Sequence, residues 1–155
     1  MTDAPLKTEV LFYHLERQPL DKVLPGLLER TLARGQRAVV QAGSRERIEA
    51  LDTLLWTYQD ESFLPHGTIE DGAPADQPVL LTETEDNPNG AVIRFLVDGA
   101  DTARLTDYQR IVYLFDGRDE DAVIAARQQW KAAKAAGCTI AYWQQNDEGR
   151  WEKKG

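Results

Sequence analysis

A chain of 155 residues that is 42% hydrophobic is long enough for one compact domain and apolar enough to build its core, which excludes a disordered polymer. No stretch approaches the roughly 20 apolar residues of a membrane span, and the N-terminus lacks the pattern of a signal peptide, so we expect no membrane association. The net charge of −8 disfavours direct binding to the nucleic-acid backbone, which requires clustered Lys and Arg. The single cysteine, Cys138, cannot form an internal disulfide, and we expect a cytoplasmic protein.

The first third of the chain alternates strand and helix signals. Residues 10–13 (VLFY) are rich in strand formers, and apolar residues then recur at helical spacing after Asp21, which we expect to cap that helix. Residues 37–41 predict a second strand. Ser44 is expected to cap a second helix that includes residues 47–55. This β-α-β-α order predicts a parallel sheet covered by helices.

The remainder of the chain predicts more strands around one long helix. Residues 60–89 contain four prolines and eight acidic residues but no Lys or Arg, so we expect a mostly irregular, solvated segment. A short helix is expected within residues 98–108 and a long helix over residues 120–136. Four further strands are predicted, at residues 79–81, 91–97, 110–115 and 138–143. The fold class is therefore α/β, with one domain over residues 1–145 and a polar, mobile extension over residues 146–155.

The chain carries no motif for a nucleotide or a metal. It contains neither a P-loop nor a G-x-G-x-x-G after the first strand. His14, His66 and Cys138 are far apart in the sequence and show no metal-ligand spacing. We therefore expect no cofactor and no metal site.

One stripe of the long final helix combines an aromatic residue with three cations. Arg127, Trp130, Lys131 and Lys134 follow the i, i+3, i+4, i+7 spacing and so lie on one side of a helix. A face of mostly small residues lies behind them, at Ala122, Ala125, Ala126, Gln129, Ala132, Ala133 and Ala136. Because arginine grips a carboxylate bidentately and lysines attract further negative charge, the stripe fits an acidic peptide that carries an aromatic residue. The alternative is a solvated helix face, where cations near the C-terminus favour the helix dipole.

Residues 54–67 (LLWTYQDESFLPHG) place large apolar side chains at a helix end and in the loop that follows. Trp56, Tyr58, Phe63 and Leu64 either fold back onto the core or form a surface for a partner. Trp and Phe are typical anchors of protein interfaces. The residues alone leave both interpretations open.

The same segment resembles the signature of a known family. Residues 55–56 (LW) and 61–66 (ESFLPH) are similar to the "LW…ESF(V/L)PH" pattern of the chi subunit of bacterial DNA polymerase III. Phe12-Tyr13, Gly35 and the run KAAKAAG at residues 131–137 match this family in type and order. The resemblance covers about residues 8–145 and does not include the extension.

The resemblance implies a Rossmann-like, mostly parallel sheet flanked by helices without nucleotide binding, and a non-catalytic accessory subunit of the replicative polymerase. Chi subunits bind the acidic C-terminal tail of single-stranded-DNA-binding protein on their last helix. The tail-binding residues of the family then fall on Arg127, Trp130, Lys131 and Lys134. One further basic position of the family falls on Val123, which implies weaker contact with the upstream aspartates of the tail.

A second implied partner is the psi subunit, through which chi subunits attach to the clamp-loader complex. The psi surface of the family falls on Trp56 and Phe63, with Pro65 and His66 beside them. A helicase-like repair protein shares this surface in some relatives. The resemblance thus implies a role in DNA replication with only indirect contact to single-stranded DNA.

Two other functions remain open. A small α/β enzyme would place its site at the carboxyl ends of the strands, with a polar cluster from residues 41–44, 98–101 and 116–118. It would require the carboxylates of Asp98 and Asp116 to converge in one pocket. A generic interaction module would use the same surfaces for different partners.

Overall fold

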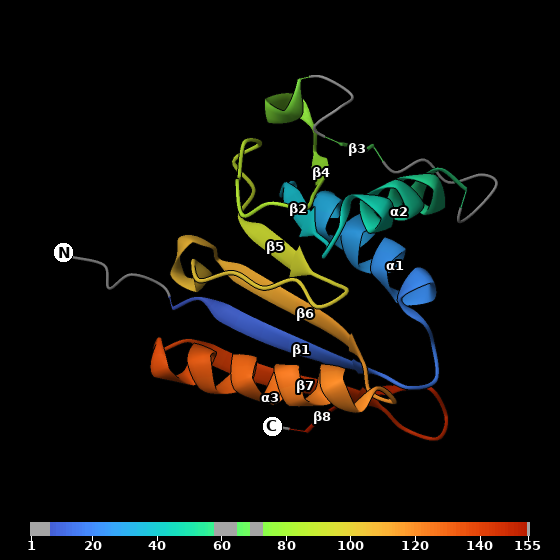
Figure 1. The fold of residues 1–155 in the computed structure, drawn as a ribbon, viewed down its shortest axis with the longest axis vertical. Helices are drawn as coiled ribbons and strands as arrows, with labels where there is room; N and C mark the ends of the chain where they lie inside the picture. Colours follow the sequence, from blue (N-terminus) through green and yellow to red (C-terminus); the bar gives the residue numbers. More distant parts are fainter. Residues whose placement is uncertain (1–6, 58–64, 69–72, 155) are drawn as a thin grey trace.

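A sheet of eight strands organises the computed structural model, which describes residues 7–57, 65–68 and 73–154 (Figure 1). The strands are β1 (Glu9–Leu15), β2 (Ala38–Gln41), β3 (Gly67–Thr68), β4 (Val79–Thr82), β5 (Ile93–Leu96), β6 (Arg110–Asp116), β7 (Thr139–Gln145) and β8 (Trp151–Lys153). Their order across the sheet is β3-β4-β2-β5-β6-β1-β7-β8, and every neighbouring pair is parallel except β7 and β8. The predicted α/β class with a mostly parallel, Rossmann-like sheet is thereby confirmed.

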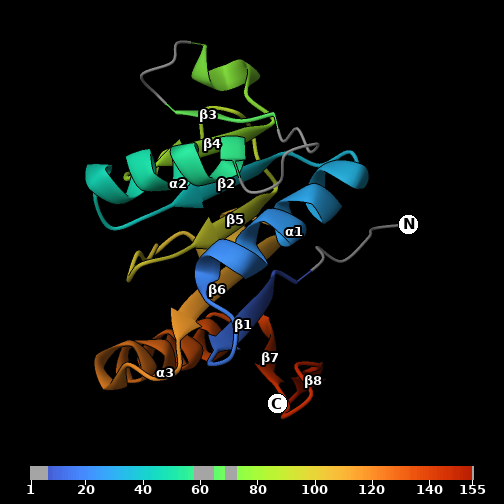
Figure 2. The same cartoon turned by 90° about the vertical axis from the view of Figure 1, so that its right-hand side faces the viewer.

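Helices cover both faces of this sheet. In the described residues they are α1 (Leu20–Ala33), α2 (Arg45–Thr57) and α3 (Glu120–Ala135), with short 3-10 helices at Pro74–Asp76 and Leu105–Asp107. α1 and α2 pack on one face, and α3 packs on the other face over β6 and β7 (Figure 2). None of the described helices is both long and apolar enough to cross a membrane.

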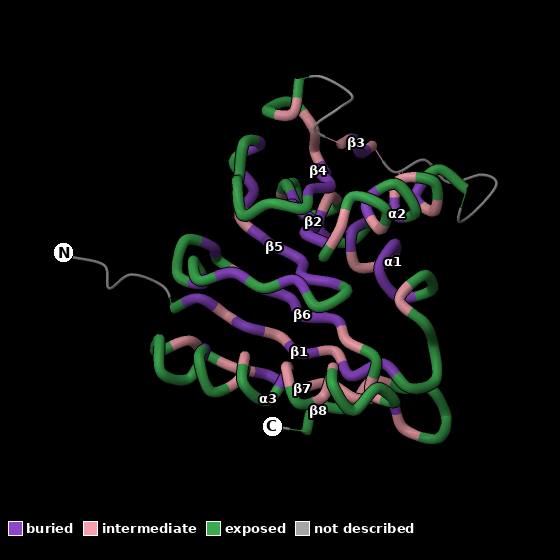
Figure 3. The backbone as a smooth tube through the Cα atoms, viewed as in Figure 1, coloured by how far each residue is buried: buried purple, intermediate pink, exposed green. Residues whose placement is uncertain are grey.

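Side chains alternate between the two faces because successive residues of a strand point to opposite sides. On β1, Val10 and Phe12 pack in the apolar cluster under α3, whereas Leu15 packs in the cluster under α1 and α2. The short strands β2, β4 and β5 are buried along their whole length (Figure 3). Parallel strands covered on both faces are expected to read as continuous apolar runs. β2 and β4 do so up to a polar last residue, whereas Arg94 interrupts the apolar run of β5.

A buried arginine secures the part of the α3 face that no described helix covers. Arg94 of β5 is 0% exposed. Its guanidinium donates to Gln41 Oε1 at 2.9 and 2.6 Å, to the Tyr108 hydroxyl at 2.9 Å, to the Asp86 carbonyl at 3.1 Å and to the Thr84 carbonyl. Gln41 lies on β2, whereas the other acceptors lie on the segments before and after β5, so Arg94 ties both segments to the sheet.

Local capping agrees with the expectation in one helix and differs in another. The Ser44 hydroxyl accepts a hydrogen bond from the Arg47 N–H at 3.3 Å, which confirms the predicted cap of α2. The prediction for α1 is wrong, because Pro19 occupies the N-cap position without a side-chain cap. Asp21 instead lies in the first turn, where its charge favours the helix dipole. The predicted short helix within residues 98–108 is only the 3-10 turn at Leu105–Asp107.

Residues that follow β7 add a further strand to the sheet. β8 pairs antiparallel with β7 through a hairpin in which Asn146 N–H donates to the Arg150 carbonyl at 2.8 Å. The Trp151 ring packs edge-on against Tyr13, with ring centroids 5.1 Å apart. The polar extension expected from the sequence is therefore attached to the sheet as far as β8.

Candidate functional site

The final helix, α3, is defined at both ends by its own sequence. The Asp119 carboxylate accepts hydrogen bonds from the backbone N–H groups of Asp121 at 3.0 Å and Ala122 at 3.4 Å. These donors have no partner within the helix, so the cap stabilises its first turn. Gly137 follows the helix with a φ of 80°, a left-handed conformation that favours glycine.

α3 packs on the sheet through a narrow face. Ala126 and Ala133, two helical turns apart, are buried against the sheet. Ala132 and Ala136 belong to the small-residue face that the spacing predicted, but they are exposed. The buried face is therefore narrower than expected, and the half-buried Trp130 takes part in it.

The cations of α3 lie on its exposed side. Arg127, Lys131 and Lys134 are exposed, and within the described part of the chain no acidic side chain forms an ion pair with any of them. Trp130 packs partly on the core, and Lys134 Nζ lies 5.0 Å from the centroid of its ring. We call these four residues the α3 surface, which combines three cations with one side of an indole.

The sheet contributes residues to this surface that the sequence analysis missed. Tyr142 of β7 packs in the same apolar cluster as Trp130. Burial raises the pKa of Tyr142, and the nearby Arg127 cation opposes that rise. The Tyr142 hydroxyl lies 2.5 Å from His14 Nδ1, and His14 Nε2 lies 2.7 Å from Glu16 Oε1. His14 and Tyr142 come from strands far apart in the sequence, and only their shared sheet face could have suggested the pairing.

The second predicted surface lies at the end of α2. Trp56 is 53% exposed, and its ring centroid lies 4.6 Å from that of His66 at an interplanar angle of 51°. His66 is buried, and its Nε2 lies 3.0 Å from Asp52 Oδ1. Pro65 beside it is half-buried, whereas Phe63 lies outside the described residues. Trp56 is thus presented to solvent over a fixed imidazole, and we call this the Trp56 surface.

The α3 surface and the Trp56 surface are separate. α2 packs near β3 and β4 at one end of the strand order, and α3 packs near β6 and β7 toward the other end (Figure 1). The two helices also cover opposite faces of the sheet. The two surfaces therefore share no residue and face different directions.

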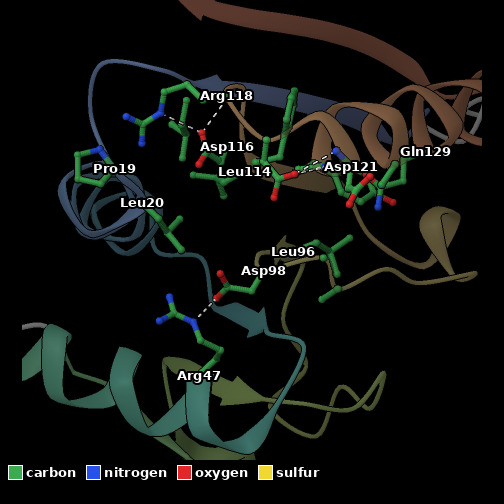
Figure 4. A pocket seen from close by; sticks show the side chains of 18 of the residues that line it. Pro19, Leu20, Arg47, Leu96, Asp98, Leu114, Asp116, Arg118, Asp121 and Gln129 are labelled. Atoms are coloured by element: carbon green, nitrogen blue, oxygen red, sulfur yellow. Dashed lines mark hydrogen bonds and ion pairs between the residues drawn. The ribbon is translucent and has the colours of Figure 1, made fainter.

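A cavity of about 560 Å³ opens at the carboxyl ends of β1, β5 and β6 (Figure 4). Asp98 and Asp116 both line it, as the enzyme alternative requires. Each carboxylate is held by its own arginine: Asp98 Oδ2 lies 2.8 Å from Arg47 Nε, and Asp116 Oδ1 lies 3.3 Å from Arg118 Nε.

One of the two carboxylates is stabilised in its ionised form. A hydrogen bond from the backbone N–H of Arg118 holds the pKa of the Asp116 carboxyl below its usual range. General acid–base catalysis instead needs a group that exchanges a proton near neutral pH. The described residues that line the cavity include no His, Lys, Cys or Ser side chain. Across the described ranges no group of three His, Cys, Asp or Glu side chains is placed to hold a metal ion.

Comparison with known proteins gives two findings. Residues 8–141 match the family model described as "DNA polymerase III chi subunit, HolC". The chain is also 28% identical over 103 residues to a protein of Rickettsia prowazekii (strain Madrid E) named "Probable DNA polymerase III subunit chi". That similarity spans 66% of this chain and 62% of the length of the Rickettsia protein.

Proposed function

The chain belongs to the DNA polymerase III chi subunit family, and from this premise we propose that it is a non-catalytic accessory subunit that connects the replicative polymerase assembly to coated single-stranded DNA. The proposal assigns the acidic C-terminal tail of single-stranded-DNA-binding protein to the α3 surface. It assigns the psi subunit of the clamp-loader complex to the Trp56 surface.

One observation carries the proposal: the guanidinium of Arg127 is exposed beside Trp130 and forms no ion pair with a described residue. A guanidinium binds a carboxylate through two parallel hydrogen bonds, and Arg127 breaks no ion pair with a described acid when it does so. The half-buried indole offers an apolar wall to an aromatic side chain. Lys131 and Lys134 attract the acidic residues that precede the tail's last residue.

Trp56 supports the psi assignment through its exposure. An exposed indole at a helix end is an unusual surface feature and a typical interface anchor. The contact with His66, which Asp52 holds in place, orients the indole before a partner arrives and so reduces the entropy lost on binding. The role of Phe63 rests on the family resemblance, because Phe63 lies outside the described residues. We extend the proposal to a helicase-like repair protein that competes with psi for the same surface.

Two weak contacts on separate surfaces suit a linking subunit. DNA coated with the binding protein presents many tails, so a subunit attached to the clamp loader meets them at high local concentration and gains avidity. The net charge of −8 agrees with a protein that contacts the coating protein and not the DNA backbone.

The tail assignment is tested with a labelled peptide that ends in Asp-Ile-Pro-Phe. We expect saturable binding of the peptide with a free C-terminal carboxylate and much weaker binding of its C-terminal amide, because the amide cannot form the bidentate pair with Arg127. Fluorescence anisotropy measures both affinities. Equal affinity of the two peptides would remove the carboxylate from the site, and absence of binding would remove the tail as a partner.

The psi assignment predicts a complete loss of co-purification with psi in Trp56→Ala, because the substitution removes the proposed anchor. The fold should persist, since Trp56 is 53% exposed. Ile124→Ala is a matched control, because Ile124 is 52% exposed but lies on α3. Psi retained by Trp56→Ala contradicts the assignment. Unfolding of that variant instead shows that Trp56 serves the core.

A further inference from the structure

Three polar side chains form a chain of hydrogen bonds beside Arg127. The Tyr142 hydroxyl, His14 and Glu16 are joined by contacts of 2.5 Å and 2.7 Å. His14 is buried, Tyr142 is half-buried and Glu16 is exposed, so the chain runs from solvent into the sheet beneath α3 and back to the surface. The function proposed above involves Arg127, which lies near these three side chains, but none of the three side chains themselves.

The positions of the protons in this chain follow from what each group can donate. An ionised Glu16 only accepts, so the hydrogen between Glu16 and His14 belongs to His14 Nε2. In a neutral imidazole Nδ1 is then an acceptor, and the Tyr142 hydroxyl must donate to it. Burial keeps this phenol protonated at neutral pH by raising its pKa. Because its single O–H donates to His14, the hydroxyl presents only lone pairs to an arriving carboxylate.

Protonation of His14 reverses the direction of that hydrogen bond. In the imidazolium both ring nitrogens donate, so Nδ1 donates to the Tyr142 oxygen and the phenol proton turns outward. We propose that this hydroxyl is a second donor to the carboxylate that Arg127 binds, and that His14 controls whether its proton is free. The proposal rests on the proposed function and assigns Tyr142 as a further binding residue and His14 as a positioning residue.

The charged groups that face His14 and Tyr142 come from three parts of the chain. Glu16 follows β1 and lies 2.7 Å from His14 Nε2, Asp116 lies at the end of β6 near His14, and Arg127 of α3 lies near Tyr142. A bound carboxylate neutralises Arg127 and accepts a hydrogen bond from the freed phenol O–H, so it binds better when His14 is an imidazolium. By linkage the affinity for the tail must then rise as the pH falls through the range in which histidines titrate.

Gly117 and Phe115 restrict movement of the His14 ring. A Cβ atom at residue 117 would lie 1.9 Å from His14 Nε2, so only glycine lets this backbone lie against the imidazole. The Phe115 ring packs on the other part of His14, with centroids 5.2 Å apart. The ring is therefore held in place while its protonation changes.

The test measures affinity for the peptide ending in Asp-Ile-Pro-Phe at constant ionic strength between about pH 8 and about pH 6, where its carboxylates stay ionised. We expect the wild-type affinity to rise about tenfold toward the lower pH, as one added charge-assisted hydrogen bond provides. Tyr142→Phe and His14→Gln should bind with an affinity that does not change over this range. The peptide amide should also show no pH dependence.

The outcomes separate this inference from the function on which it rests. Binding that depends on Arg127 but is equal at both pH values overturns the roles of Tyr142 and His14 alone. Absence of binding that depends on Arg127 overturns both. A Tyr142→Phe variant that keeps the full pH dependence also overturns the inference.

A measurement on the unaltered protein guards against variants that fail to fold. The chain has two histidines, so the titration of each ring can be followed by NMR. Bound peptide should move the titration of the His14 ring to higher pH and leave that of His66 unchanged. Identical His14 titrations with and without peptide overturn the proposal.

Discussion

Arg94 and Arg127 lie on the same face of the sheet and have opposite surroundings. Arg94 is fully buried and donates five hydrogen bonds to Gln41, Tyr108 and two loop carbonyls. Arg127 is exposed, and its guanidinium forms no hydrogen bond or ion pair with another described residue. A guanidinium whose donors are all used holds the fold together, and one whose donors are unused is ready for a partner. The hydrogen bonds therefore distinguish Arg94, which serves the structure, from Arg127, which we propose as the tail-binding arginine.

The largest effect is expected when the structural arginine is removed. Arg94→Met keeps much of the apolar volume but leaves Gln41, Tyr108 and the loop carbonyls without a donor. Since a buried unsatisfied polar group costs about 1–3 kcal/mol, and the loss of a buried charge offsets part of this, we expect a decrease of about 3 kcal/mol in the free energy of unfolding. Urea denaturation measures it. An Arg94→Met variant as stable as the wild type would contradict the structural role of Arg94, because the loops would then stay on the sheet without it.

Removal of Arg127 should instead affect binding and not stability. Arg127→Ala should lower the affinity for the tail peptide by a factor of about 30, or about 2 kcal/mol, and leave the urea midpoint unchanged. Arg45→Ala is the matched control, because Arg45 is also an exposed helical arginine but lies on α2 across the sheet. A peptide titration that gives the same affinity for Arg127→Ala and wild type contradicts the tail site.

A smaller effect is expected for the lysine that lies near the indole. Lys134→Ala removes one exposed charge and the contact of its Nζ with the Trp130 ring. We expect a loss of about threefold in tail affinity and a shallower dependence on salt, because exposed charges act over distances that salt screens. Titrations at low and high ionic strength give both quantities. An unchanged salt dependence would mean that Lys134 does not face the tail.

The smallest effect is expected at Val123, where the family resemblance implies a basic residue that this chain lacks. Val123 lies one helical turn before Arg127 and is half-buried. Val123→Lys extends the stripe and should tighten tail binding about twofold, since an exposed ion pair contributes about 0.2–1 kcal/mol. Val123→Gln has a comparable polar side chain without the charge and serves as control. If Val123→Lys and Val123→Gln bind the tail peptide with equal affinity, the longer side chain and not its charge is responsible for the gain.

Features encoded by neighbouring residues could be predicted from the sequence. The order of strands and helices follows from apolar runs and turn residues, and the sharing of one side of α3 by Arg127, Trp130 and Lys134 follows from helical spacing alone. The Ser44 cap was predictable because a cap needs only residues a few positions apart. The cap of α1 was not, because the N-cap position falls on Pro19, whose side chain has no hydrogen-bonding group.

Features that join distant residues could not be predicted. Gln41 and Arg94 meet across 53 residues, and His14 and Tyr142 meet across 128 residues. These contacts depend on the strand order and on which face each side chain occupies, and a single sequence fixes neither. The sequence also left open whether Trp56 is core or surface, because an indole at a helix end suits both environments.

The hairpin that ends in β8 has a consequence for self-association. Without β8, the backbone of β7 over Trp143–Gln145 would offer unpaired donors and acceptors that could template strands of other molecules. β8 pairs with this segment, spans only three residues and carries the exposed charges of Glu152 and Lys153. A short, charged outer strand resists further strand addition, so copies of the chain at high local concentration are protected from aggregating through this edge.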